Sequence, residues 1–196
     1  MNQSLALSIL KSGRNVFLTG EAGSGKTYVI NHYVQRLRSC GIQVAITAST
    51  GIAATHIGGV TIHSRSGIGI KNELTDHDME LLQQKEHLHK QINKAKVLII
   101  DEISMLSAHT LDMIDRVVQM HRRDGRPFGG MQVIFVGDFF QLPPVMALQA
   151  DGSESPKRFA FAAQAWKNAD LFFCYLETQH RQAGGAFATL LNTLRK

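Results

Sequence analysis

The stretch NVFLTGEAGSGKT, residues 15–27, runs from an apolar hexapeptide into a glycine-rich loop and ends on Lys26 and Thr27. Its last eight residues have the spacing of the phosphate-binding pattern G-x-x-x-x-G-K-[ST]. Polyphosphate binding requires closely spaced backbone N–H donors, which glycines offer without Cβ clashes, and a helix that follows adds the positive end of its dipole. The sequence therefore predicts a strand over residues 15–20, a phosphate loop, and a helix over residues 27–40.

Apolar runs alternate with helical stretches along the rest of the chain. Further strands are expected over residues 43–49, 97–101, 132–138 and 171–177, and helices over residues 5–10, 73–95 and 106–122. Gly41 is expected to end the helix before it, Ser107 to cap the helix after it, and residues 151–158 to form a polar loop. Nearly unbroken apolar strands that alternate with helices are typical of a parallel sheet covered on both faces. We expect one α/β domain over residues 1–196.

Composition narrows the class of protein. The chain has 196 residues, of which 44% are hydrophobic and 19% charged, as in a soluble globular domain. A net charge of +5 suggests an acidic partner, most commonly nucleic acid. Cys40 and Cys174 are far apart in sequence and are expected to be reduced thiols, and no Cys–His spacing predicts a zinc site. No segment has the length of a membrane span, so we expect a cytoplasmic protein without membrane contact.

A pair of acids follows the apolar run VLIID, where a buried strand is expected to open beside the phosphate loop. Lys26 is expected to reach the β- and γ-phosphates of ATP, and Thr27 to coordinate Mg²⁺ through its hydroxyl. Asp101 can hold the Mg²⁺ shell, and Glu102 can polarise the attacking water as general base. The alternative is a surface acid pair that caps the next helix. The loop expected to bind ATP is Gly20, Glu21, Ala22, Gly23, Ser24, Gly25, Lys26 and Thr27.

A second apolar strand ends in VGDFFQLPPV, residues 136–145. The amide of Gln141 can contact a γ-phosphate oxygen and a neighbouring group at once, which would make it a sensor of ATP against ADP. Equally, Gln141 can be an ordinary polar loop residue ahead of Pro143 and Pro144, which would form a rigid exit from the sheet. The residues alone leave both interpretations open.

Four segments in order, TASTGIAATHIGGVTIHS (47–64), LIIDEISML (98–106), GDFFQLPPV (137–145) and LETQHRQ (176–182), give a more specific pattern. Together with the phosphate loop, the chain resembles the first motor domain of the PIF-type (petite integration frequency) DNA helicases. These are superfamily-one, 5′-to-3′ enzymes related to RecD. The resemblance implies a RecA-like P-loop NTPase fold, ATP and Mg²⁺ as cofactors, single-stranded DNA as partner, and a role in DNA repair, recombination or telomere maintenance.

The resemblance also assigns roles to individual residues. It implies that Gln3 reads the adenine edge, that Gln141 couples hydrolysis to movement, and that Arg181 contacts the γ-phosphate as an arginine finger. The contacts to single-stranded DNA that it implies are Ser49, Thr50, Gly51, His63 and Ser64.

The chain departs from the family pattern at two places. Arg65 stands where the family commonly has an aromatic residue that can stack on a base. Two outcomes are open: Arg65 contacts DNA with a greater salt dependence, or the contact is altered or weakened. The family's second motor domain is absent from these 196 residues. We therefore expect an incomplete motor with little activity alone, nucleoid-associated in a bacterium, with nuclear or mitochondrial locations also open.

Two other classes of function remain open at this stage. A small-molecule kinase would need an arginine-rich lid, for which HRRDGR, residues 121–126, is the candidate segment. Phosphoryl transfer to a small acceptor, unaffected by DNA, would indicate it. A non-catalytic, nucleotide-gated module would bind ATP without turnover, although such a module has no need to keep Glu102.

Overall fold

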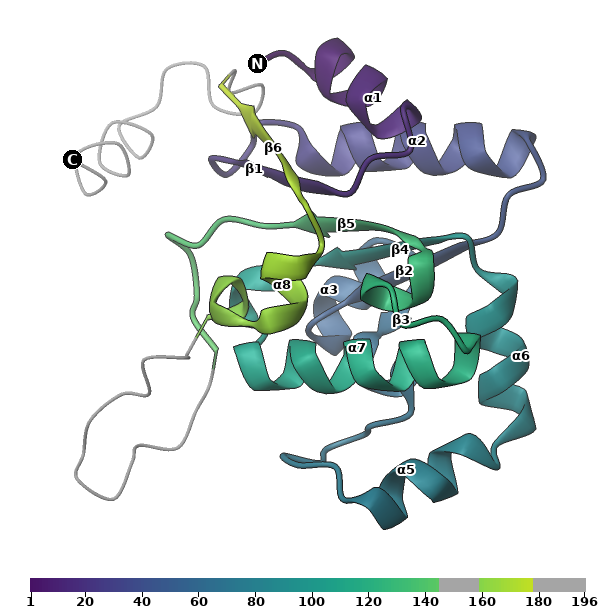
Figure 1. Ribbon diagram of the computed structural model, residues 1–196. Helices are drawn as coiled ribbons and strands as arrows, with labels where there is room; N and C mark the ends of the chain where they lie inside the picture. The colour runs from purple at the N-terminus through teal and green to yellow at the C-terminus, as the bar shows by residue number, and fades with distance from the viewer. Residues whose placement is uncertain (145–158, 178–196) are drawn as a thin grey trace, which may run out of the picture.

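The computed structural model describes residues 1–144 and 159–177, and within them the chain forms a single parallel sheet flanked by helices (Figure 1). The sheet has six strands in the order β3-β2-β4-β5-β1-β6, and every pairing is parallel. The strands are β1 (Val16–Gly20), β2 (Val44–Ala48), β3 (Val60–Thr61), β4 (Val97–Asp101), β5 (Gln132–Val136) and β6 (Phe172–Leu176). The expected α/β fold is therefore confirmed.

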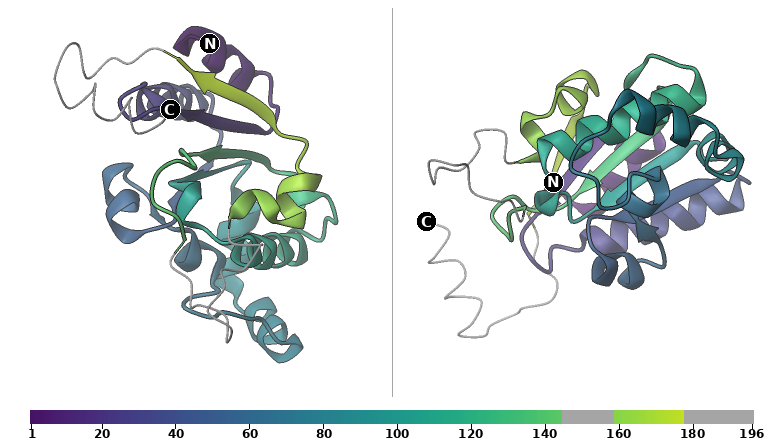
Figure 2. Two further views of the ribbon diagram at one scale, coloured as in Figure 1. Left: turned by 90° about the vertical axis from the view of Figure 1, so that its left-hand side faces the viewer. Right: turned by 90° about the horizontal axis from the view of Figure 1, so that it is seen from below.

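Helices cover both faces of this sheet, as Figure 2 shows from two further directions. Within the described residues they are α1 (Gln3–Lys11), α2 (Lys26–Ser39), α3 (Gly51–His56), α4 (Ile62–Ser66), α5 (Asp76–Gln83), α6 (Glu86–Lys94), α7 (Ala108–Arg122) and α8 (Gln164–Asn168). Helices α1 and α2 lie on one face, and α5 to α8 lie on the other (Figures 1 and 2). This layering places the carboxyl ends of all the strands along one edge, where ligands bind in open α/β sheets.

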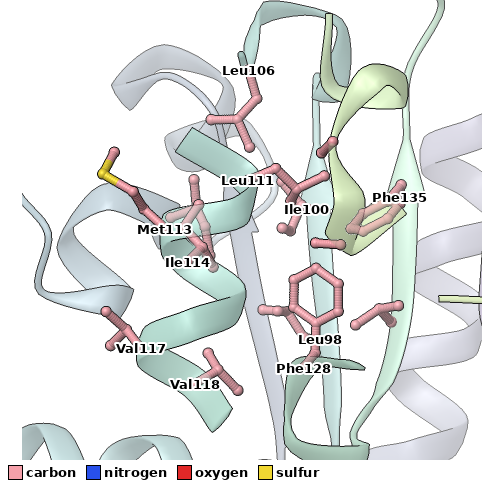
Figure 3. Close-up of a cluster of buried hydrophobic side chains, with 14 of the residues drawn as sticks. Leu98, Ile100, Leu106, Leu111, Met113, Ile114, Val117, Val118, Phe128 and Phe135 are labelled. Atoms are coloured by element: carbon pink, nitrogen blue, oxygen red, sulfur yellow. The ribbon is translucent and has the colours of Figure 1, made fainter. Parts of the chain in front are cut away.

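The two faces bury separate hydrophobic clusters because strand side chains alternate in direction. On the α7 face, Leu111 and Ile114 point toward Leu98 and Ile100 of β4, and Phe128 packs against Phe135 of β5 (Figure 3). On the α2 face, the buried side chains include Val29, Ile30, Val34, Ile99 and Ile134. Strand β4 is thus buried on both sides, which explains its unbroken apolar sequence.

Most of the expected elements are confirmed, with small shifts at their ends. Ser107 caps α7 by accepting the Thr110 N–H at 3.1 Å, and Gly41 follows α2 with a φ of +71°. The expectation that residues 73–95 are mostly helical is confirmed, and two helices, α5 and α6, occupy the segment. Lys85 adopts an extended conformation (ψ 92°) between them, and the Thr75–Asp78 capping box starts the first.

The sequence did not predict the short helices α3, α4 and α8 or the short strand β3. Each has two to six residues, too few for a periodic pattern of apolar side chains to stand out. The polar loop expected over residues 151–158 lies outside the described residues. No helix in the described part of the chain combines the length and apolar character needed to cross a bilayer.

Candidate nucleotide and nucleic-acid site

The phosphate loop follows β1 at the carboxyl edge of the sheet, between β5 and β6. Gly20 has a φ of +145°, and a Cβ placed there would lie 2.6 Å from the Leu176 carbonyl oxygen and 2.9 Å from the Ser24 hydroxyl. Gly25 caps α2 in the left-handed region with a φ of 91°. Glycine is required at both places, for close approach at Gly20 and for the backbone conformation at Gly25. The loop thus leads directly into the N-terminus of α2, as the sequence predicts.

Lys26 folds back over the loop. Its Nζ donates to the carbonyl oxygens of Gly20 at 2.7 Å and Glu21 at 3.1 Å. Thr27, the next residue of α2, is exposed and keeps its hydroxyl open to a ligand. The ammonium group therefore lies within the cradle, where a polyphosphate could replace the two carbonyl oxygens as its partner.

Gln3 lies beside the loop although it is distant in sequence. Asn2 caps α1 by accepting the Leu5 N–H, and this helix carries Gln3 to the loop. The Gln3 Nε2 donates to the Ser24 carbonyl oxygen at 3.4 Å, and its side chain is partly exposed. The arrangement leaves an amide at the rim of the loop, able to face a base.

Asp101 and Glu102 stand at the end of β4. The Asp101 Oδ1 accepts the Glu102 N–H at 2.9 Å, and Glu102 has a left-handed backbone with a φ of 53°. Burial raises the pKa of Asp101, although the Glu102 N–H and Lys26 oppose this. Burial raises the pKa of Glu102 as well, with Asp101 and Asp138 adding to the effect and Lys26 opposing it. Lys26 is therefore close enough to act on both acids, and the surface acid pair is not supported.

Asp138 and Gln141 follow β5 and lie at the same carboxyl edge of the sheet. Asp138 is buried, and its carboxylate accepts the Phe140 N–H at 3.1 Å and the Gln141 Nε2 at 3.3 Å. Gln141 is itself exposed. The amide is held in place by a buried acid and is not a free loop side chain. Arg181, the expected arginine finger, lies outside the described residues.

Oxygen donors suited to a hard cation are present at the same edge. Thr27 is exposed at the start of α2, and Asp101 is partly buried at the end of β4. Mg²⁺ prefers a few protein oxygens together with phosphate oxygens and water, so these residues fit it. No cluster of three or more His, Cys, Asp or Glu side chains that could hold a metal exists among the described residues.

Thr50 and His63 line one cleft of about 560 Å³ on the α3–α4 side of this edge. Thr50 caps α3 by accepting the Ala53 N–H at 3.3 Å, and Gly51 and Ser64 are exposed. Burial lowers the pKa of His63, which favours the neutral ring. These four residues of the expected DNA contacts therefore lie on or near one surface.

Two of the expected DNA contacts have other partners. Ser49 is 9% exposed, and its hydroxyl donates to the Glu102 carbonyl oxygen at 2.8 Å. The Arg65 guanidinium donates to the Gln91 carbonyl oxygen of α6 at 2.8 Å, and burial lowers its pKa. Neither side chain lines the cleft that contains Thr50 and His63.

The cleft has further polar residues that the sequence motifs did not indicate. Lys71, Asn72, His109 and Thr110 line it opposite Thr50. Lys71 forms an ion pair with Asp78 at 2.6 Å. The residues belong to the loop before α5 and to the first turn of α7, so only the tertiary fold gathers them beside Thr50.

The basic segment of residues 121–126 does not form a lid over the loop. Helix α7 starts after β4 and runs back along the sheet, so its last residues lie at the opposite edge (Figure 1). There the Arg122 Nε donates to the Gly129 carbonyl oxygen at 2.6 Å and its Nη1 to that of Ala95 at 3.0 Å. Arg126 pairs with Asp124 at 2.6 Å. This position removes the observation on which the kinase alternative depended.

Comparisons with known proteins agree with the family resemblance seen in the sequence motifs. The family model described as "PIF1-like helicase" matches residues 2–190. The ATP-dependent DNA helicase Pif1 of Psychrobacter sp. is 54% identical over 185 residues, which cover 94% of this chain and 28% of that protein. The crystal structure of Pif1 helicase from Candida albicans has a TM-score of 0.89 and 37% identity, over 99% of this chain and 43% of that one. Pif1 helicase from Bacteroides in complex with ADP-AlF3 and ssDNA has a TM-score of 0.76 and 34% identity, over 98% and 45%.

Proposed function

The chain belongs to the PIF1-like helicase family, and from this membership we propose that residues 1–196 form the first, ATP-hydrolysing motor domain of a 5′-to-3′ DNA helicase. The chain spans about a quarter of the curated relatives' length, which leaves room in them for a second motor domain. Translocation needs two domains that close and open around ATP, so this domain alone is an incomplete motor. We propose that this activity serves DNA repair, recombination or telomere maintenance. The location would be a nucleoid, a nucleus or a mitochondrion.

One observation carries the proposal: the fold brings Lys26 close enough to Asp101 and Glu102 to oppose the rise that burial causes in the pKa of both acids. A cation for phosphate, an acid for Mg²⁺ and an acid for water activation then share one edge of the sheet. The relatives are named ATP-dependent DNA helicases, which supports ATP as the nucleotide. In this scheme Gln3 reads the adenine, and the backbone N–H groups of residues 20–27 surround the phosphates.

Hydrolysis follows from the two acids and their different surroundings. When bound, Mg²⁺ would be held by Thr27 and Asp101 and would neutralise charge that develops on the phosphates. Glu102 accepts the proton of the attacking water, since its pKa is raised toward the working pH. Gln141, held by Asp138, contacts the γ-phosphate and relays its loss, and Arg181 stabilises the transferred charge.

Single-stranded DNA runs along the cleft beside α3 and α4. The hydroxyl of Thr50, the exposed backbone at Gly51, and Ser64 are suited to phosphate contacts, which carry affinity without sequence information. His63 lines the same cleft, and its neutral ring can stack or donate. Arg65 is a DNA contact only if the strand displaces its bond to Gln91, so we assign it mainly to the α4–α6 contact.

ATP hydrolysis with and without oligo-dT tests the proposal, with Glu102→Gln as the matched control. The chain is expected to bind ATP and oligo-dT and to turn over slowly, and a form extended with the second motor domain is expected to show DNA-stimulated turnover. Glu102→Gln should abolish that turnover while nucleotide binding remains. Phosphoryl transfer to a small acceptor, or ATP binding without turnover in the extended form, would contradict the assignment.

A further inference from the structure

Ser49 connects the DNA side of the domain to the catalytic side. It follows β2, and its N–H donates to the Asp101 carbonyl oxygen at 3.1 Å while its hydroxyl donates to the Glu102 carbonyl oxygen at 2.8 Å. Both acceptors belong to the pair of acids at the end of β4. Residue 50, the next along the chain, caps α3 and lines the proposed DNA cleft. Consecutive residues therefore face the two sites.

The backbone of Glu102 depends on its surroundings. Its left-handed conformation is uncommon for a residue with a side chain and persists only where neighbouring groups hold it. The Asp101 carboxylate holds its N–H at 2.9 Å, and the Ser49 hydroxyl and the Met105 N–H, at 3.1 Å, hold its carbonyl oxygen. Two of these three groups connect to the DNA cleft: Met105 lines it, and Ser49 precedes Thr50, which lines it at the start of α3.

The opposite side of this segment is closed. A Cβ at Gly137, after β5, would lie 3.1 Å from both the backbone nitrogen and the Cγ2 of Ile103. The Glu102–Ile103 backbone is thus packed between Ser49 on one side and Gly137 on the other. This close approach leaves little room toward β5, so we expect a displacement of Ser49 to be taken up largely as a rotation at Glu102.

We propose that Ser49 is a positioning residue that couples occupancy of the DNA cleft to the direction of the Glu102 carboxylate. A strand bound at Thr50 shifts the start of α3, and Ser49 transmits that shift to the Glu102 carbonyl. Ser49 is 9% exposed and its hydroxyl already donates to protein, which argues against a direct contact with DNA. The inference rests on the proposed function, since it requires both ligands to bind.

The test is a linkage measurement on the chain itself. The Kd of a non-hydrolysable ATP analogue is measured with and without saturating oligo-dT, for the wild type, Ser49→Ala and Ser49→Cys. Allosteric coupling typically changes affinity by about 5-fold or more. We expect such a ratio in the wild type and a ratio below about 2 in both variants, while the Kd for oligo-dT alone stays within about 2-fold.

Two further variants separate positioning from folding. Ser39→Ala removes a hydroxyl that donates to the Arg36 carbonyl oxygen at 2.8 Å, the same kind of bond away from both sites, and should leave the ratio unchanged. Ser49→Thr keeps the hydroxyl and should restore the ratio if Ser49→Ala loses it. Restoration also shows that the loss does not come from a general loss of folding.

The outcomes decide between distinct readings. A Ser49→Ala chain with weaker oligo-dT binding and an intact ratio would make Ser49 a DNA ligand and overturn the inference. An unchanged ratio in Ser49→Ala, or no coupling in the wild type, would overturn it as well. A wild type that binds neither ligand would instead refute the proposed function, which the separate titrations reveal.

Discussion

Two acids whose carboxyl groups are removed from solvent to different degrees, the buried Asp115 on α7 and the partly buried Glu102 after β4, show how differently one domain treats the same chemical group. Burial raises the pKa of both carboxyl groups. Each is linked to an uncommon left-handed backbone, at Phe128 (φ 50°) near Asp115 and at Glu102 itself (φ 53°). What differs is the set of partners around each carboxylate.

Asp115 is satisfied by neutral donors. Its Oδ1 accepts the Phe128 N–H at 2.5 Å, and its Oδ2 accepts the Gln119 Nε2 at 2.8 Å. These bonds hold the segment 127–130 so that the Phe128 ring is fully buried beneath α7 (Figure 3). The acid therefore serves the fold, and its bonds lower the cost of burying it.

Asp112 also raises the pKa of Asp115, but it ranks behind the two hydrogen bonds, whereas the like charge of Asp101 is the largest effect on Glu102 after burial. Asp101 and Asp138 both raise its pKa, and Lys26 is the cation that opposes them. The chain thus keeps a partly buried carboxylate in unfavourable surroundings, as active sites commonly do at some cost in stability. The contrast indicates that Asp115 maintains structure and that Glu102 is held ready for chemistry, and each half of that statement can be tested.

The largest effect should come from Glu102→Gln on catalysis. If Glu102 is the general base, ATP turnover in a form with the second motor domain should fall by about 10²–10⁴-fold, because the amide cannot accept the water's proton. The affinity for ATP should stay within a few-fold, since Lys26 and the phosphate loop are unchanged. Steady-state turnover and a nucleotide titration measure the two quantities.

Asp115→Asn is the matched control for that experiment. It changes an acid on α7, away from the phosphate loop, to its amide, and it should leave turnover nearly unchanged wherever the variant is folded. Equal losses of turnover in the two variants would mean that neither loss reports on a catalytic base.

The next effect is on stability, from Asp115→Ala. Removing the carboxylate leaves the buried Phe128 N–H without its acceptor, which should lower the free energy of unfolding by about 2–3 kcal/mol. Urea unfolding followed by circular dichroism measures this. Glu80→Ala, at an exposed position of α5, should change stability by less than about 0.5 kcal/mol. Little change in Asp115→Ala would contradict the structural role given to this acid.

The sequence predicted these two acids unequally. Glu102 was recognisable because it ends an apolar strand beside a glycine-rich motif, and both signals are local. Nothing local marks Asp115, because its partner Phe128 is 13 residues away and its role depends on how α7 packs. Local signals also explain why the long elements were predicted, since each contains enough residues for an apolar pattern. The short elements α3, β3, α4 and α8 contain too few residues for such a pattern and were not predicted.

The candidate site divides in the same way. Motif spacing predicted the phosphate loop and both acids, and the fold brings them to one edge. Motif spacing did not reveal that Ser49 donates to the Glu102 carbonyl or that Arg65 donates to the Gln91 carbonyl. Hydrogen bonds between distant strands and helices have no local sequence pattern. The cleft residues Lys71 and His109 also come together only in the tertiary structure.

A smaller effect is the loss of folding stability at acid pH that we expect from His121. His121, at the end of α7, is 2% exposed, and neither ring nitrogen has a hydrogen-bond partner among the described residues. Burial, with His89 adding, lowers its pKa. The unfolded chain then binds the proton more readily, so stability should fall as pH drops below about 6.5 and toward the lowered pKa.

His121→Leu should remove part of that dependence. The difference in Tm between wild type and variant should change by roughly 2–4 °C from pH 7.5 to pH 5.5, with the wild type losing more. His77→Leu, the same substitution at an exposed position, is the control. Parallel curves for wild type and His121→Leu would show that His121 does not contribute to acid lability.

The smallest effect should have the opposite sign from that of Asp115→Ala, and it comes from Glu102→Gln on stability. The pKa of Glu102 is raised in the folded chain, so ionisation favours the unfolded state, and the cost builds up as pH rises from about 4.3 through the raised pKa. The neutral amide removes repulsion from Asp101 and Asp138. The nucleotide-free variant should therefore melt about 1–3 °C above the wild type at pH 8, and the gap should close near pH 4. Glu73→Gln, an exposed position with the same change in charge, should show no such gap. A Glu102→Gln chain that melts below the wild type at pH 8 would mean that Glu102, like Asp115, stabilises the fold, and the distinction between the two acids would be lost.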